Sequence, residues 1–207
     1  SVETLLRIAT THKAKTLNYI STLSIFTSEG QSADRVVEES TSLNEERHEA
    51  INGYEASKWV ADKLIGLAQE RSVPCNIFRL GLVWADSVQG RFDSLQREHR
   101  ILDSCVQSGF GLTDYRYEMN PVPVDFNTKA ISKLSKINTN GGQVFHLGGS
   151  AGVKINIHDS FQENANAAFE PISTFDWIKE VKYMHMKGRT LPAVPFLEQA
   201  FSMDEMS

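Results

Sequence analysis

Helix and buried-strand patterns alternate over the first 83 residues of this 207-residue chain, and this alternation constrains the fold more than any other feature. Apolar residues at helical spacing predict a helix from the first residues to about Thr10. Residues 17–26 begin as a buried strand, residues 54–71 predict an amphipathic helix, and residues 76–83 predict another buried strand. Such alternation predicts an α/β fold with parallel strands joined by right-handed crossovers.

The alternation breaks from Ala85 to Pro123. We expect a surface loop over 27–52, before the second helix, and an irregular segment from Gly109 to Pro123. A helix is predicted over 94–108. Its inward-facing apolar side chains should be Leu95, Ile101, Leu102, Cys105 and Val106. The remaining predicted elements are a helix over 124–136, a turn at 140–142, a strand over 144–147, and helices near 157–169, 175–187 and 196–203.

Composition excludes several classes of protein. The apolar share of 41% and the charged share of 23% are ordinary for a soluble globular chain. A net charge of -5 without a dense Lys/Arg patch argues against nucleic acid. No apolar run approaches the ~20 residues that cross a bilayer, and no signal peptide opens the chain. Two distant cysteines predict reduced thiols of a cytoplasmic protein, and six scattered histidines predict no metal site.

Tyr54 and Lys58 are four residues apart at the start of the second predicted helix, so both should project from one face. A free phenol titrates near pH ~10, and a nearby ammonium brings its proton-transfer chemistry closer to neutral pH. Chance produces such pairs readily, and a second pair is present at Tyr183 and Lys187. A packing or capping role for Tyr54 therefore stays open.

Hydroxyl and glycine residues stand at the ends of the two predicted strands. Ser21, Thr22 and Ser24 follow the apolar part of the first strand, and Gly81 allows close backbone approach near the end of the next. In an open α/β sheet, ligands bind at the carboxyl ends of the strands. These hydroxyls either serve a ligand or merely cap the strand.

Taken together, these motifs resemble the thioester reductase domains of nonribosomal peptide and polyketide synthetases, in the extended short-chain dehydrogenase/reductase superfamily. Trp59 after the lysine, and Ser-Thr-Leu-Ser at the strand end, favour this branch over sugar epimerases. Residues after about 150 match only loosely. The matching segments, in the family's order, are residues 5–9, 19–26, 53–64, 78–83, 86–90, 123–126 and 144–147.

The resemblance implies a catalytic triad of Thr22, Tyr54 and Lys58 and the cofactor NADPH. Thr22 would hydrogen-bond the substrate carbonyl, and Tyr54 would donate a proton to it as hydride arrives from the nicotinamide. Lys58 would hold the ribose hydroxyls and favour the ionised phenol. The implied cofactor-binding residues are Ser21, Tyr54, Lys58, Leu80, Gly81, Leu82 and Val83, with Leu80 standing where the family usually has proline.

One departure from the family concerns the pyrophosphate of the cofactor. Such domains hold it on a Gly-rich turn between the first strand and helix, and no Gly-x-x-Gly-x-x-Gly occurs in this sequence. The first helix also has no capping segment ahead of it, as in a chain cut inside a helix. We therefore expect the C-terminal part of a longer reductase domain, whose upstream half would be a partner of this chain.

The expected fold class is α/β, the C-terminal part of a Rossmann-like doubly wound parallel sheet with a mostly helical substrate-binding subdomain. Residues 1–84 would form the core with the catalytic helix, and 85–123 a substrate-binding insertion. Residues 124–150 would return to the core, and 151–207 would form the helical C-terminal subdomain.

The implied activity is NADPH-dependent release of an acyl or peptidyl thioester from the phosphopantetheine of a carrier domain, as an aldehyde or alcohol. The 207 residues by themselves are expected to be inactive. Two alternatives remain: a nucleotide-sugar epimerase or dehydratase with the same triad, and a catalytically incomplete binding or structural module.

Overall fold

The structure is a computed structural model that describes residues 1–26, 36–43, 53–115, 118–148, 155–156 and 169–197. The chain forms two compact units, one from residues 1–88 and 120–151 and the other from residues 89–119 and 152–207. Across the described ranges, no helix is both long and apolar enough to span a membrane.

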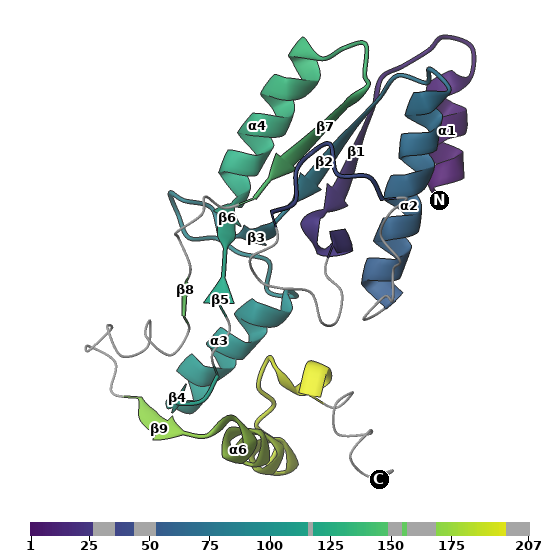
Figure 1. Cartoon of the computed structure of the whole chain (residues 1–207). Coiled ribbons are helices and arrows are strands. Elements are labelled where there is room, and N and C mark those ends of the chain that lie inside the picture. Colours follow the sequence, from purple (N-terminus) through teal and green to yellow (C-terminus); the bar gives the residue numbers. More distant parts are fainter. Residues whose placement is uncertain (27–35, 44–52, 116–117, 149–154, 157–168, 198–207) are drawn as a thin grey trace. The chain divides into compact units, whose positions relative to one another are not determined.

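A three-stranded parallel sheet forms the centre of the first unit (Figure 1). Its strands are β1 (Leu17–Thr22), β2 (Cys75–Leu80) and β7 (Gln143–Leu147), in the order β1-β2-β7. The parallel pairing confirms the α/β prediction. β2 is buried at five of its six positions, because it has a strand on each side and helices over both faces.

Helices cover the two faces of this sheet (Figure 1). α1 (Val2–Thr10) and α2 (Gly53–Glu70) lie on one face, and α4 (Val124–Ile137) lies on the other. All three confirm predicted helices to within a residue or two. The core between α2 and the sheet includes Ile65 at 0% exposure and Ile77 at 1%.

The start of α1 differs from the expectation. Ser1 is its N-cap, and the side-chain oxygen of Ser1 accepts a hydrogen bond from the Thr4 backbone N–H at 3.4 Å. The expectation of an uncapped helix is therefore wrong. A single serine directly before the helix is enough to accept a hydrogen bond from a free N–H of the first turn.

The apolar side chains that predicted α2 do not all face the core. Val60, Leu64 and Leu67 are 50%, 44% and 40% exposed. The buried side chains are Asp62, Ile65 and Ala68. A polar residue therefore lies at the centre of the inward face, and the apolar pattern alone predicts the helix but not its rotation.

The predicted strand over 76–83 is interrupted at Gly81. β2 ends at Leu80, and β3 (Leu82–Trp84) then pairs in parallel with β6 (Pro121–Pro123). Irregular structure was predicted up to Pro123, and this is wrong where β4 (Phe110–Leu112), β5 (Glu118–Met119) and β6 form. These strands have two or three residues each, too few to show a periodic pattern.

The second unit packs α3 (Arg97–Ser108) and α6 (Thr174–Met186) around a separate core. In this unit β4 pairs in parallel with β9 (Glu170–Ile172), and β5 pairs in antiparallel fashion with β8 (Ile155–Asn156). The core is apolar and contains the buried residues Ile101, Cys105, Leu112, Trp177, Val181, Leu191, Ala193, Val194 and Leu197.

The inward-facing set predicted for α3 is partly wrong. Ile101 and Cys105 are buried, as predicted, but Leu95 is 70% and Val106 60% exposed. Leu95 precedes the first residue of α3, and Val106 lies about 100° around the helix from its buried neighbour Cys105.

The remaining predicted helices have mixed outcomes. α6 confirms the helix predicted over 175–187. The helix predicted over 157–169 lies almost wholly outside the described residues. Of the helix predicted over 196–203, only the part up to Leu197 is described, where residues 194–197 form one helical turn.

Candidate active site

The three parallel strands end side by side. Thr22 is the last residue of β1, its partner across the sheet is Leu80 of β2, and Leu80 in turn pairs with Leu147 of β7. Directly after Thr22 the chain turns into the short 3-10 helix η1 (Leu23–Phe26). The candidate site is therefore built at the carboxyl edge of the sheet, where open α/β sheets bind ligands.

The hydroxyl of Thr22 makes local hydrogen bonds. Its Oγ1 accepts from the Ser24 backbone N–H at 3.2 Å and lies 3.0 Å from the Ser24 Oγ. Thr22 and Ser24 therefore cap the strand end, which is the structural role that the sequence left open. A hydroxyl has one proton and two lone pairs, so this role leaves Thr22 able to bond a ligand as well.

Ser21 lies deeper than Thr22. It is only 3% exposed, and its Oγ has no hydrogen-bond partner among the residues that the structure describes. Successive strand residues point to opposite faces, so Ser21 and Thr22 project from opposite sides of β1. The two hydroxyls are adjacent in sequence but lie in different surroundings.

Lys58 is drawn to the end of β1. Its Nζ donates a hydrogen bond to the Ile20 carbonyl at 3.2 Å and lies 5.7 Å from the centroid of the Tyr19 ring. Both contacts come from residues two or three positions before Thr22. The helix α2 thus places the ammonium beside the strand end.

Tyr54 lies in the first turn of α2, where its side chain is 58% exposed. Burial raises the pKa of Tyr19 above its usual range, and the negative charge of Asp62 adds to the rise. No hydrogen bond joins Tyr54 to Thr22 within the described part of the chain.

Gly81 brings the ends of β2 and β7 together. Its N–H donates to the Leu147 carbonyl at 2.9 Å. A Cβ at this position would lie 3.3 Å from the Gly148 Cα, which is closer than such atoms normally approach. Leu80, Leu82 and Val83, which the sequence hypothesis assigns to the same wall, are half-buried.

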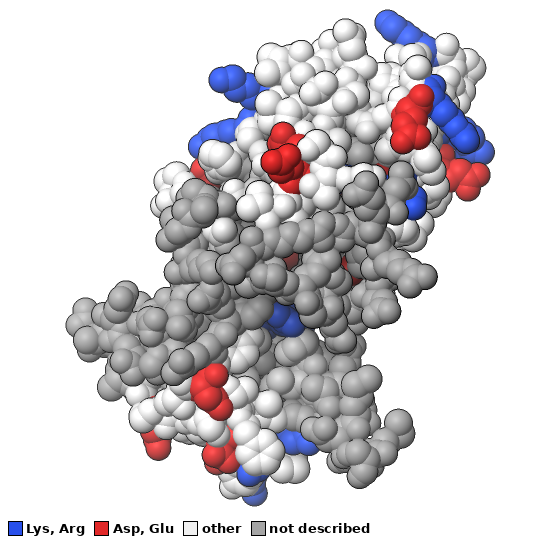
Figure 2. All heavy atoms as spheres, viewed as in Figure 1, with Lys and Arg blue, Asp and Glu red and all other residues white. Residues whose placement is uncertain are grey.

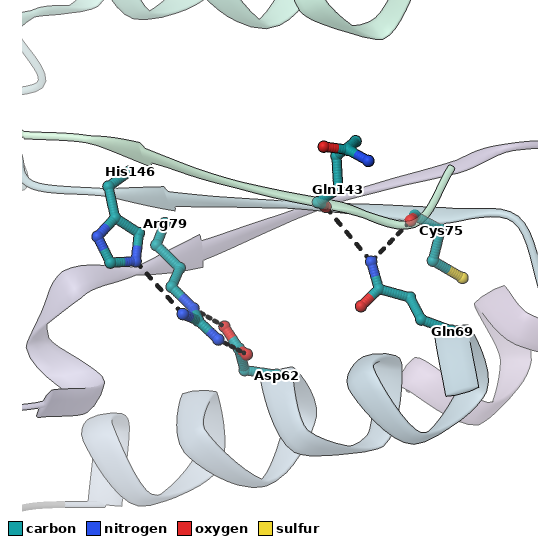
Figure 3. Close-up of polar contacts among 6 residues, drawn as sticks. All are labelled: Asp62, Gln69, Cys75, Arg79, Gln143 and His146. Atoms are coloured by element: carbon teal, nitrogen blue, oxygen red, sulfur yellow. Dashed lines mark hydrogen bonds and ion pairs between the residues drawn. The ribbon is translucent and has the colours of Figure 1, made fainter. Parts of the chain in front are cut away.

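A row of polar contacts joins α2 to the sheet, and the sequence hypothesis missed it (Figure 3). Asp62 of α2 accepts two hydrogen bonds from the guanidinium of Arg79 in β2, at 2.9 and 3.1 Å. Further along α2, Gln69 donates to the carbonyls of Cys75 and Gln143 at 2.8 and 3.3 Å. An arginine inside a strand predicted to be buried could have signalled this row, because a buried charge needs a partner.

The described surface carries charges of both signs. On the face drawn in Figure 2, basic and acidic side chains are interspersed among the described residues, without one sign prevailing.

Burial lowers the pKa of His146 below its ordinary value, and the positive charge of Arg79 lowers it further. The imidazole therefore stays neutral near pH 7 beside the guanidinium.

The second Tyr-x-x-x-Lys pair has a different arrangement. Lys187 Nζ lies 5.5 Å from the Tyr183 ring centroid, so the two side chains contact each other at the end of α6. Tyr183 is 53% exposed. This is a surface cation–π pair rather than a lysine aimed at a strand end.

The sequence matches one family model and several large synthetases. The family model for the NAD-binding "Male sterility protein" matches residues 1–131. A linear gramicidin synthase of Brevibacillus parabrevis is 29% identical over 181 residues, which are 87% of this chain and 4% of that protein.

Solved structures share the fold of this chain. The terminal R domain from the myxalamid PKS-NRPS biosynthetic pathway superposes with a TM-score of 0.70 and 26% identity, over 88% of this chain and 45% of that one. A thiolation-reductase di-domain from an archaeal non-ribosomal peptide synthetase, at 19% identity, shares the fold with a TM-score of 0.65 over 92% and 41% of the two chains. The chain thus spans less than half of either structure.

The family match covers the residues that build β1, α2 and β2, which carry the candidate site, and the sequence and structure comparisons agree with it. The chain therefore belongs to the NAD-binding male sterility protein family, among the thioester reductase domains of the extended short-chain dehydrogenase/reductase superfamily.

Proposed function

We propose that the protein carrying this chain is an NADPH-dependent reductase that releases an acyl or peptidyl thioester from a carrier domain as an aldehyde or alcohol. The observation that carries the proposal is Lys58 held at the Ile20 carbonyl, 3.2 Å away, with Tyr54 one turn before it and Thr22 at the strand end. The relatives support the substrate class, because one is a linear gramicidin synthase and another joins a thiolation domain to a reductase domain.

The donors present fit a nicotinamide nucleoside. Lys58 offers an ammonium and Tyr54 an exposed phenol at the carboxyl edge of the sheet, and these groups suit ribose hydroxyls and a carbonyl oxygen. Ser21 keeps its proposed place in the cofactor site, where its buried Oγ has no hydrogen-bond partner among the described residues, and Leu80 to Val83 form the wall. When bound, the nicotinamide supplies the hydride.

The chain's own residues manage the developing charge. Thr22 donates a hydrogen bond to the substrate carbonyl oxygen, which becomes negative as the carbon is reduced. Tyr54 transfers its phenolic proton to that oxygen. The Lys58 charge stabilises the phenolate left behind. The C–S bond of this tetrahedral product then breaks, its hydroxyl proton passes to the leaving sulfur, and an aldehyde and the free phosphopantetheine thiol are released.

The adenosine and phosphates of the cofactor need a further part of the protein. This sequence contains no Gly-x-x-Gly-x-x-Gly turn, and it spans 45% of the myxalamid domain. We propose that the upstream half of the same domain supplies that turn, with residues 1–84 and 124–150 completing the core. Residues 85–123 and 151–207 would then bind the acyl chain.

The test is nicotinamide consumption by the intact protein with an acyl thioester on its carrier domain. Replacing Tyr54 by Phe should lower turnover by about 10²-fold or more, the usual contribution of a general acid. Tyr183→Phe is the matched control, because it removes the same hydroxyl from the other Tyr-x-x-x-Lys pair, and it should leave turnover unchanged. Normal turnover in Tyr54→Phe would refute the role of Tyr54, and tight binding of a nucleotide sugar without thioester reduction would favour an epimerase.

A further inference from the structure

We propose that the buried Asp62–Arg79 ion pair is a positioning device that sets α2, and with it Tyr54 and Lys58, against the strand end that carries Thr22. The inference rests on the proposed roles of those three residues. Neither Asp62 nor Arg79 touches the reacting atoms in this proposal. Both act through the side chains that do.

The ion pair is buried and bidentate (Figure 3). Arg79 Nε donates to Asp62 Oδ2 at 3.1 Å, and Arg79 Nη2 donates to Oδ1 at 2.9 Å. Asp62 is 1% and Arg79 4% exposed. Two parallel hydrogen bonds between planar groups fix both distance and orientation, which a single contact does not.

On the helix side, the pair lies one turn from Lys58. Lys58, Asp62, Ile65 and Gln69 follow one another at helical spacing, and each contacts the sheet or its core. A rise of about 1.5 Å per residue places Asp62 roughly 6 Å along α2 from Lys58. Because Lys58 shares this face, a rotation of α2 about its axis would withdraw its Nζ from the Ile20 carbonyl.

On the sheet side, Arg79 contacts the element that follows Thr22. Its Cζ lies 5.0 Å from the centroid of the Phe26 ring, and Phe26 ends η1, which begins directly after Thr22. Its Nη1 lies 3.3 Å from His146 Nε2 of β7. One guanidinium thus contacts α2, η1 and β7, the elements around the carboxyl edge of the sheet.

The position of Arg79 within the sheet supports the same conclusion. Its neighbours across the sheet are Ser21 in β1 and His146 in β7, one residue before the row of Thr22, Leu80 and Leu147. The ion pair is therefore one step from the candidate site along the central strand. A stabilising pair alone would serve equally well anywhere in the core.

The experiment separates positioning from stability in the intact protein. Breaking the pair with Asp62→Asn or Arg79→Lys should lower both Tm and kcat, because it leaves a buried charge without its bidentate partner. Replacing both residues, with Asp62→Leu and Arg79→Met, removes both charges and should restore Tm, as apolar replacements of buried pairs often do. The surface ion pair Asp125–Lys129 on α4, replaced by the same two residue types, is the control. It should lower Tm, because Asp125 also accepts hydrogen bonds from Ser87, and it should leave kcat unchanged.

The double variant decides the proposal. We expect its Tm within a few degrees of the wild type, with kcat still lowered about 10-fold or more, since small misplacements of catalytic groups cost that much. Thioester KM should stay unchanged, because the pair does not contact the substrate in this proposal. Full recovery of kcat together with Tm would overturn the proposal and leave a purely structural pair.

A crystal structure of the double variant tests positioning without any turnover. The proposal predicts that Lys58 Nζ has left the Ile20 carbonyl, and an unchanged contact would contradict it even where Tm and kcat agree. If Tyr54→Phe turns over as fast as the wild type, the proposed function fails. The Lys58–Ile20 contact in the crystal structure then still decides whether the ion pair sets the position of α2.

Discussion

The aromatic ring of Tyr19 should hold Lys58 in place, and its removal should weaken catalysis by a small, definite factor. Lys58 Nζ lies 5.7 Å from the ring centroid, inside the range of a cation–π contact. The ring is half-buried and packs against the core beneath α2. The perturbation is Tyr19→Leu, which keeps an apolar side chain but removes the ring.

The expected magnitude follows from this geometry. A cation–π contact of a partly exposed ammonium is worth about 0.5–1 kcal/mol. If that energy is lost from the placement of Lys58, kcat/KM should fall about 2- to 5-fold. The second contact of Lys58, to the Ile20 carbonyl at 3.2 Å, uses the backbone and survives the substitution, so a larger loss is not expected.

The matched variant is Tyr19→Phe, which retains the ring and removes only the hydroxyl. Nicotinamide oxidation by the intact protein is followed at 340 nm with an acyl thioester. Tyr19→Phe should remain within about twofold of the wild type, because the ring face supplies the contact. Equal losses in both variants would refute the reasoning, since the hydroxyl would then carry the effect.

Three further predictions concern stability. Gly141→Ala should lower Tm more than Gly142→Ala: both residues have positive φ, at 71° and 82°, but only the Cβ at 141 would meet backbone, 2.4 Å from the Cys75 nitrogen. Asp125 accepts a hydrogen bond from the Ser87 backbone N–H, which lowers the pKa of Asp125 to about 2. The stability that this carboxylate contributes is present above about pH 4 and is lost as pH falls toward 2. Asp125→Asn should therefore flatten the fall of Tm with pH in this range. Because the folded protein lowers the pKa of His146, neutral His146 contributes stability above about pH 6.5, and this contribution is lost as pH falls below that value. In His146→Gln, this part of the decrease in Tm with falling pH should be absent.

The sequence predicts elements with strong periodicity or end signals. α2 and α4 appear within two residues of their predicted bounds, and the pairing of β1, β2 and β7 is parallel as predicted. β6 was missed because it has only three residues and its partner β3 lies far away in the chain. Long-range pairing leaves little trace in a local pattern.

The sequence predicts that Tyr54 and Lys58 share one side of α2, and the structure brings Lys58 Nζ to the Ile20 carbonyl of β1. The sequence hypothesis missed the contacts that support this arrangement, because the partner of Arg79 becomes evident only once the helix and strand are packed together. An apolar pattern on α2 treats Asp62 as a surface residue. The division into the segments 1–84, 85–123, 124–150 and 151–207 stays a prediction. So does the triad of Thr22, Tyr54 and Lys58, which turnover experiments must decide.

The most direct measurement of the central claim follows the hydride itself. The intact protein, loaded with an acyl thioester, is given NADPH that carries deuterium at the transferred position, and the released product is analysed by mass spectrometry. We predict one deuterium on the former thioester carbon of the aldehyde, or two on the alcohol, and loss of this product in Tyr54→Phe but not in Tyr183→Phe. Release of the free acid without deuterium, or labelled product from Tyr54→Phe at the wild-type rate, would contradict the account.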